Sequence, residues 1–226
     1  MTKFKEIFTI EYFGYLLKCA RLSLLLAFSS VFFGTLIGTL LAAMKISKNK
    51  VLKFIATVYI DVVRGTPMLL QIMLFYFGLP VFVPGYSNLS FSTQILITGI
   101  IGMSLNSAAY SAELIRSGIE SIDKGQWEAA KALGLSSSQT MKLVILPQAF
   151  KRIVPPMVSE LITLIKDSSL LSSFGAVELL MGAKTIGSHF YSYIIPLCMA
   201  GMIYLVLTSI ISALSRLLER KLSFYD

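Results

Sequence analysis

Long runs without a single charged residue are the feature that most constrains this chain. Such runs cover residues 22–44, 95–112 and 190–215. A helix that crosses a bilayer needs about 20 mostly apolar residues, and these three runs reach or approach that length. A fourth uncharged run, residues 68–94, contains Pro80, Pro84 and Gly85, so it predicts a helix followed by a loop. The chain is therefore predicted to be an all-helical integral membrane protein.

Composition agrees with a membrane protein and excludes several other classes. Only 14% of the residues are charged and 55% are hydrophobic, whereas soluble domains carry about 25% charged residues. The net charge of +8 is better explained by membrane topology than by nucleic acid, which we do not expect as a partner. Two cysteines and one histidine without ligand spacing predict no metal site. The first apolar run is too long for a cleavable signal peptide.

Basic residues predict which end of each helix faces the cytoplasm. Four lysines cluster in residues 45–53, and basic residues also mark the segment 118–150 and the C-terminus. Cytoplasmic loops are enriched in lysine and arginine, so all three segments are placed inside. With five spans, the N-terminus is then outside and the C-terminus cytoplasmic. The basic residues of segment 1–21 do not fit this rule, and we expect that segment to lie on the outer membrane surface.

The expected layout is one membrane domain, residues 1–226, with five transmembrane helices. The first contains Gly34 and Gly38, whose spacing suits close helix packing within the chain or between subunits. The fourth begins near Pro155 and Pro156, because proline is accepted in a first helical turn. The helices are predicted over residues 22–44, 54–79 (ending before Pro80), 94–117, about 153–177, and 190–215, with an outer loop at 80–93 and a cytoplasmic insert at 118–150.

The insert predicts two short helices. The first, residues 125–133, carries one apolar face formed by Trp127, Ala130 and Leu133, and Gly134 ends it as a C-terminal glycine does.

Ser136 to Ser138 can cap a second helix over residues 139–146, which Pro147 ends. Both helices are too short to cross a membrane, so they must pack on something. The partner is either the cytoplasmic helix ends of the same chain or another protein.

The insert resembles a known family signature. Glu128, Ala129, Ala130 and Gly134 match the EAA loop of bacterial ABC-importer permeases, and Leu146-Pro147 complete it. Val144 stands where the family usually has isoleucine. Residues 64–80, 108–136 and 146–172 look like the polar amino-acid branch of that family, the histidine, glutamine and arginine type, with Ser168 in place of its usual threonine.

This resemblance implies a transporter subunit rather than an enzyme. It implies a dimer with a second permease subunit, identical or homologous, two ATPase subunits, and an external or periplasmic amino-acid-binding protein, all at a bacterial cytoplasmic (inner) membrane. In that family the loop is a coupling helix seated on the ATPase, so Trp127, Glu128, Ala129, Ala130, Leu133 and Gly134 are the expected coupling residues. No phosphate-binding loop is found, because in the nearest match, residues 182–185, Ala183 stands between the glycine and the lysine. ATP and magnesium are therefore expected on the partner, and no cofactor on this chain.

Polar residues inside the predicted spans are the candidates for substrate binding, since charge in a membrane is costly. Glu160 and Asp167 are seven residues apart, within about 20° of two full helical turns, so both carboxylates share one face. They could hold the ammonium group of an amino acid or a basic side chain, or be neutralised by Lys166 or Arg64. The full set of candidates is Glu160, Asp167, Thr163 and Ser169, with Asn106 and Tyr110, which share a stripe with Glu113. Interhelical hydrogen bonding is the alternative use of that stripe.

Three other functions remain open from the residues alone. One is an ion-coupled carrier or channel independent of ATP, with Glu160 and Asp167 as its cation site. Another is a membrane scaffold that recruits an ATPase without transporting anything. The third keeps the ABC machine and changes the cargo to an opine or another small zwitterion.

Overall fold

The computed structural model describes residues 6–223, and every regular element in that part of the chain is a helix. Three helices are long and apolar enough to cross a membrane: α2 (Ile10–Ile46), α5 (Phe91–Glu120) and α10 (Ile194–Ser223). Each contains the greater part of one predicted span and extends beyond it at one end or both. The Thr9 side chain accepts a hydrogen bond from the backbone of Tyr12 and caps α2, so from residue 10 on the N-terminal segment is part of this helix.

The second predicted span is broken into two helices. Residues 54–79 were expected to form one helix, but α3 (Lys50–Arg64) and α4 (Met68–Phe82) are bent by 103° at their junction. The cause lies in Pro67, which donates no backbone hydrogen bond and disfavours helical geometry in the residue before it. Pro80, expected to end the helix, lies inside the last turn of α4. The outer loop is correspondingly short and contains a single turn, η1 (Tyr86–Asn88).

The helix that follows the insert also starts earlier than predicted. α7 (Ser137–Gln139), the π-helix η2 (Thr140–Ile145) and α8 (Leu146–Asp167) follow one another without a gap. Pro147 therefore does not end a helix but stands in the first turn of α8, where a missing N–H is harmless. Pro155 and Pro156 lie inside α8, which membrane helices tolerate when local π-type turns satisfy the freed groups.

The number of membrane crossings remains partly a prediction. By length and composition, the described residues hold three candidate spans, or four if α3 and α4 form one broken span. The fourth predicted span corresponds to α8, in which Glu160, Lys166 and Asp167 lower the apolarity. After α8 the chain turns through η3 (Ser168–Phe174) into α9 (Leu179–Phe190).

Small residues allow α2 and α5 to lie in close contact. Gly34 and Gly38 of α2 face Ser107 and Ser111 of α5, and a Cβ atom added at Gly38 would lie 2.7 Å from the Cβ of Ser111. This spacing confirms the packing of the two glycines within the chain. The α2–α5 pair is the central contact of the fold. The hydrophobic effect does not drive helices together in lipid, so the close approach of the two backbones takes its place.

A buried carboxylate joins α2, α9 and α10. Glu178 is fully buried, and its side chain accepts hydrogen bonds from the backbone N–H groups of Leu180 (2.9 Å) and Met181 (2.8 Å), which caps α9. It also accepts from the hydroxyls of Tyr204 (2.9 Å) on α10 and Ser23 (3.4 Å) on α2. Four donors from three helices therefore converge on one side chain.

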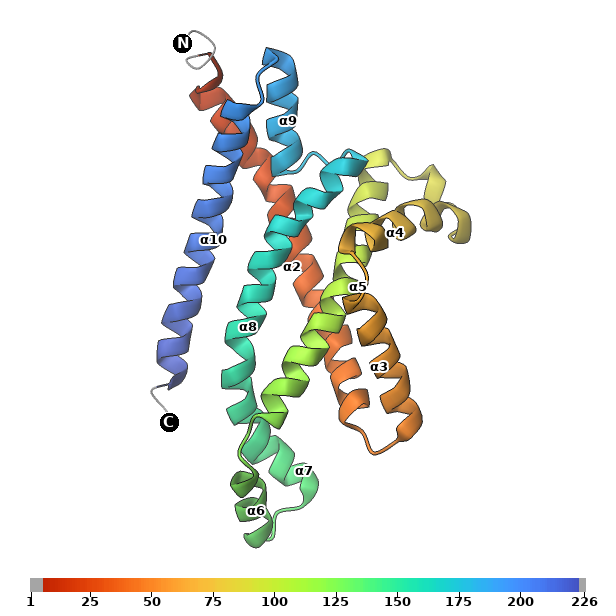
Figure 1. Cartoon of the computed structure of the whole chain (residues 1–226), viewed down its shortest axis with the longest axis vertical. Helices are drawn as coiled ribbons and strands as arrows, with labels where there is room; N and C mark the ends of the chain where they lie inside the picture. Colours follow the sequence, from red (N-terminus) through yellow and green to blue (C-terminus); the bar gives the residue numbers. More distant parts are fainter. Residues whose placement is uncertain (1–5, 224–226) are drawn as a thin grey trace.

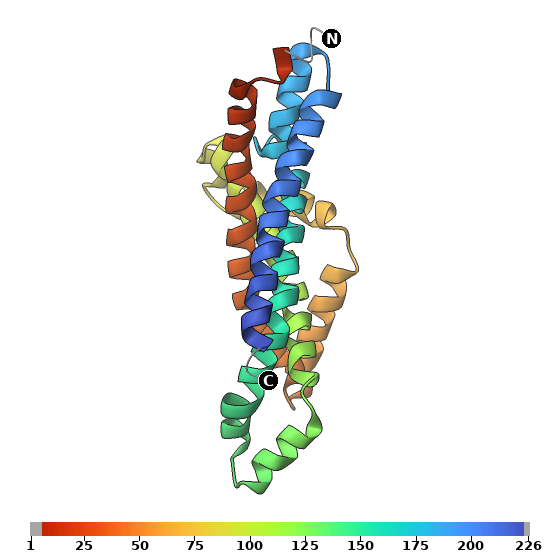
Figure 2. The same ribbon diagram turned by 90° about the vertical axis from the view of Figure 1, so that its left-hand side faces the viewer.

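Figures 1 and 2 show how these helices are arranged along the long axis of the molecule. The N-terminal end of α2 lies at one end beside α9. The α2–α3 turn and the insert with α6 (Lys124–Ala132) and α7 lie at the other, toward which the C-terminal end of α10 also points. The segments predicted to be cytoplasmic are thus on the same side.

Candidate functional site

The insert contains the first predicted short helix, as α6, whereas the predicted second one is not a separate helix but continues through η2 into α8. The Asp123 side chain accepts a hydrogen bond from the backbone of Gly125 (2.7 Å) and caps α6. Gly134 ends α6 in a left-handed backbone conformation (φ +78°), which residues other than glycine rarely adopt. Ser136 and Gln139 then form a reciprocal capping box that starts α7.

The predicted apolar face of α6 is divided between two environments. Trp127 packs against the cluster that contains Ile145 and Ala149, and Ala130 is buried, with only 3% of its surface exposed. Leu133 is 81% exposed instead, because α6 ends at Ala132 and the chain turns away there. Glu128 and Ala129 are also exposed. The insert therefore packs on its own chain through one face and presents the other outward.

Leu143, Leu146 and Phe150 of the insert are exposed as well. Isolated exposed apolar side chains are common, but four on an insert of this size leave apolar area uncovered in the single chain.

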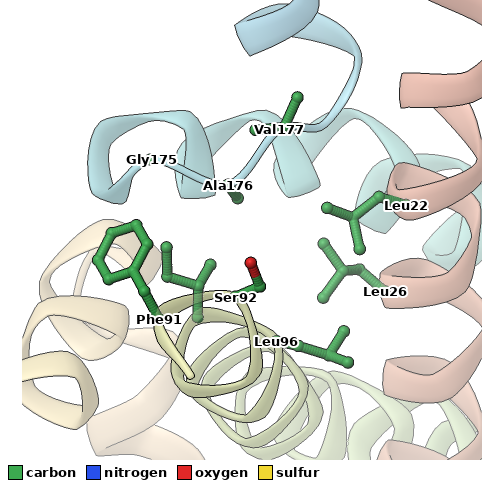
Figure 3. A pocket seen from close by; sticks show the side chains of 9 residues that line it. Leu22, Leu26, Phe91, Ser92, Leu96, Gly175, Ala176 and Val177 are labelled. Atoms are coloured by element: carbon green, nitrogen blue, oxygen red, sulfur yellow. The ribbon is translucent and has the colours of Figure 1, made fainter. Parts of the chain in front are cut away.

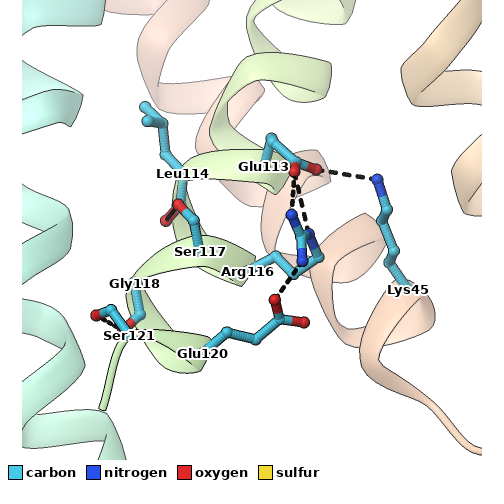
Figure 4. A network of polar contacts seen from close by, with 8 residues as sticks. All are labelled: Lys45, Glu113, Leu114, Arg116, Ser117, Gly118, Glu120 and Ser121. Carbon is cyan, nitrogen blue, oxygen red and sulfur yellow. Dashed lines mark hydrogen bonds and ion pairs between the residues drawn. The ribbon is translucent and has the colours of Figure 1, made fainter. Parts of the chain in front are cut away.

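A polar network fixes the root of the insert (Figure 4). Lys45, at the end of α2, donates to the Glu113 carboxylate of α5 at 3.0 Å. Arg116 pairs with both Glu113 and Glu120 along the same face of α5. Arg152 of α8 donates to the Ser121 hydroxyl at 3.1 Å. These contacts connect the ends of α2, α5 and α8 that lie nearest the insert.

Sequence reasoning missed this network, although part of the signal was available. The predicted polar stripe includes Glu113, but Arg116 was not predicted to lie beside it. Their spacing of three residues, with Glu120 four residues further on, is that of neighbours on a helix surface. The contact with Lys45 spans 68 residues and is a product of the fold.

A cavity of about 300 Å³ lies between α3, α5 and α8. Three predicted substrate residues line it: Tyr110, Glu160 and Thr163. Arg64 lines it as well, with its guanidinium carbon 5.5 Å from the centre of the Tyr110 ring, within the range of a cation–π contact. The cavity therefore presents a guanidinium and a carboxylate to the same space.

Asn106 does not join this cavity. It is buried and donates to the side-chain oxygen of Gln71 at 2.9 Å. Gln71 in turn donates to the backbone oxygen of Val63 and the hydroxyl of Thr66, both at 2.8 Å. The pair thus ties α5 to the break between α3 and α4, and Gln71 is a residue that sequence reasoning did not single out. Of the predicted stripe, Tyr110 and Glu113 line the cavity and Asn106 does not.

The remaining two candidates lie at the far end of α8. Asp167 is the last residue of α8 and Ser169 is in η3, both half-buried and outside the residues that line the cavity. Glu160 and Asp167 share a helix face as predicted, but the length of two turns separates them. The structure thus brings together Tyr110, Glu160 and Thr163 only.

A second pocket, of about 220 Å³, lies near the opposite end of α5 (Figure 3). Its walls are almost wholly apolar, and the side chains of Leu22, Leu26, Phe91 and Leu96 point into it. It offers no charged group to a polar ligand. Among the described residues, no group of three or more histidine, cysteine or acidic side chains could hold a metal ion.

Comparison with known proteins identifies the family. Residues 34–224 match the family model described as "Binding-protein-dependent transport system inner membrane component". The chain is 42% identical over 193 residues to a protein of Rickettsia bellii (strain RML369-C) named as a putative glutamine transport system permease protein GlnP, covering 85% of this chain and 86% of that one. It is 41% identical over 218 residues to the arginine transport system permease protein ArtQ of Bacillus subtilis (strain 168), covering 96% and 97%.

A solved structure agrees. The fold matches a chain in the crystal structure of an amino acid ABC transporter with histidines, with a TM-score of 0.85 and 37% identity over 94% of this chain and 96% of that chain. Membrane-crossing helices, a family model covering most of the sequence, and relatives of nearly equal length all agree. The chain belongs to the inner-membrane components of binding-protein-dependent transport systems, as a permease of the amino-acid ABC transporter type.

Proposed function

We propose that this chain forms the translocation path of an ATP-driven amino-acid importer, with the cavity between α3, α5 and α8 as the place where substrate is held. The observation that carries the proposal is the presence of Arg64 and Glu160 in the walls of one cavity. An amino acid carries a carboxylate and an ammonium group on one carbon. A guanidinium binds a carboxylate well, and a carboxylate binds an ammonium, so the cavity suits both ends of a zwitterion.

Tyr110 and Thr163 complete the proposed site as neutral hydrogen-bonding groups in the cavity wall. Asp167 and Ser169 belong to a deeper part of the path, and Asn106 acts through Gln71 on the shape of the α3–α4 break. The relatives named for glutamine and arginine favour a polar amino acid, either glutamine or a basic one such as arginine.

The proposed partners follow from the outward surface of the insert. Glu128, Ala129 and Leu133 would bind a separate ATPase subunit, while Trp127 and Ala130 hold the insert on its own chain and Gly134 makes the turn. Two such ATPases with ATP and magnesium, a second permease subunit and an external amino-acid-binding protein complete the assembly. In this arrangement the N-terminus is outside and the C-terminus in the cytoplasm.

The substrate site is tested by uptake into proteoliposomes. The chain is reconstituted with its ATPase and binding protein, and uptake of labelled arginine, glutamine and histidine is measured with and without ATP. Glu160→Gln is expected to lower ATP-driven uptake by about tenfold or more, because a loss of 1.4 kcal/mol is tenfold. Glu11→Gln, which changes an exposed carboxylate on α2, serves as the matched control.

Two outcomes would reject the proposal. Uptake that proceeds equally without ATP would favour an ion-coupled carrier or channel. If Glu160→Gln and Arg64→Gln both leave uptake intact, the cavity is not the substrate site. Preference for an opine over the amino acids keeps the cavity and changes the cargo, since an opine presents the same charged groups.

The coupling surface is tested by crosslinking. A cysteine at exposed position 129 is expected to crosslink to the ATPase, whereas one at the adjacent, buried position 130 is not. Ala129→Cys and Ala130→Cys form a matched pair one residue apart. Equal crosslinking of both, or of neither, would contradict the proposed docking face.

A further inference from the structure

Three lysines gather at the turn between α2 and α3. Lys48 lies in the turn, and Lys50 and Lys53 lie in the first turns of α3, all with exposed side chains. None of the three takes part in the ion pairs found among the described residues. Lys45, the fourth lysine of this segment, is different because Glu113 already neutralises it.

The charges on this turn are uncompensated locally. The first acidic residue of α3 is Asp61, more than two helical turns beyond Lys53. An uncompensated cluster of three positive charges raises the local potential and attracts an anion.

Exposed apolar side chains follow immediately beside the lysines. Val51, Phe54 and Ile55 are all exposed, and Phe54 is 68% so. Their helix is a component of the one broken candidate span. Positive groups at the end of a membrane helix, directly next to an uncovered apolar surface, match a ligand with an anionic head and hydrocarbon chains.

We propose that the α2–α3 turn binds the headgroups of anionic phospholipids, with Lys48, Lys50 and Lys53 as the contacting residues. The lysines supply charge complementarity, and the apolar face of α3 is continuous with the membrane region into which acyl chains extend. The inference rests on the proposed function only for the leaflet, which is the cytoplasmic one in the proposed orientation. It holds for lipid and not for soluble phosphate, because the apolar surface has no role in binding a free anion.

Lipid retention provides the test. The full chain is placed in nanodiscs that contain phosphatidylcholine and phosphatidylglycerol. The protein is then released from the nanodiscs, and the lipid that stays bound to it is identified by native mass spectrometry. The wild-type chain is expected to retain phosphatidylglycerol in preference to phosphatidylcholine. With each lysine contributing about 1 kcal/mol, or about fivefold, near an anionic surface, K48Q/K50Q/K53Q should lower that preference by on the order of 100-fold.

A control variant removes the same charge elsewhere. K124Q/K131Q/K142Q changes three exposed lysines of the insert, and the preference should remain. K48R/K50R/K53R keeps the charge at the turn and should keep the preference, which separates binding from any effect on folding.

The inference fails if the wild type shows no preference, if the insert variant loses it equally, or if inorganic phosphate at millimolar concentration abolishes it. The measurement does not involve transport, so a chain that retains phosphatidylglycerol but imports no amino acid would reject the proposed function and leave the lipid site standing.

Discussion

Replacing Glu178 by alanine should destabilise the contact between α2, α9 and α10. Loss of the N-cap of α9 costs about 1 kcal/mol. The Tyr204 hydroxyl then loses its acceptor in a buried place, which costs about 1–3 kcal/mol. Ser23 accepts a hydrogen bond from the backbone of Leu179 and its hydroxyl can rotate, so its loss is small. The cavity left by the smaller side chain destabilises the protein, whereas removal of a buried carboxylate stabilises it, and these two effects oppose each other. We therefore expect the free energy of unfolding to fall by about 2–4 kcal/mol.

Thermal unfolding in detergent measures this loss. Cys19 is buried and Cys198 exposed, so in a Cys198→Ser background a thiol-reactive dye reports the opening of the α2–α9 contact. One kcal/mol corresponds to about 2–4 °C in a chain of this size, which predicts a drop of about 4–16 °C. Tyr204→Phe should give a smaller drop, and exposed Glu128→Ala almost none.

The reasoning about Glu178 is refuted if Glu178→Ala melts within about 2 °C of the wild type. The four converging hydrogen bonds would then contribute less stabilising free energy than buried hydrogen bonds are expected to contribute.

Three further variants test other contacts. Gly38→Ala should destabilise by about 1–3 kcal/mol in the same unfolding assay, because the added Cβ would lie 2.7 Å from that of Ser111, whereas Gly14→Ala meets nothing within 4 Å and should be neutral. Gly134→Ala forces a left-handed conformation on alanine at a cost of about 1–2 kcal/mol, and should lower the uptake obtained per ATP hydrolysed while the apparent substrate affinity stays unchanged. Gln71→Leu removes the acceptor of a buried amide and should lower stability by about 1–3 kcal/mol; an unchanged melting temperature would show that the α3–α4 break needs no such tie.

The spanning helices were predictable because lipid leaves few choices to an uncharged run. Residues 22–44, 95–112 and 190–215 must satisfy their backbone groups internally, and a helix does so. Several of the errors involve proline. Pro67 breaks a span that hydrophobicity alone presents as continuous, while Pro147 and Pro80 lie in helices that they were expected to end. Whether a proline breaks a helix depends on which neighbouring groups replace its hydrogen bond, and tertiary structure decides that.

The candidate site was predictable where one helix determines the geometry. Glu160 and Thr163 lie less than one turn apart on α8, and the cavity receives both. Asn106 was harder to place, because its partner Gln71 lies on a different helix and the contact depends on the α3–α4 bend. The role of Arg64 depends on the same bend, which ends α3 at that residue and leaves its side chain beside Tyr110.

The absence of a break between Ser137 and Asp167 fixes the rotational phase of the insert relative to the cavity. Each residue of a helix turns the chain by about 100°, so one residue inserted in η2 would swing the outward surface of the insert by about that angle while Glu160 stayed in place. Four inserted residues would return it to within about 40° of its original direction. The spacing between docking surface and cavity is therefore a matter of counting residues as much as of choosing them.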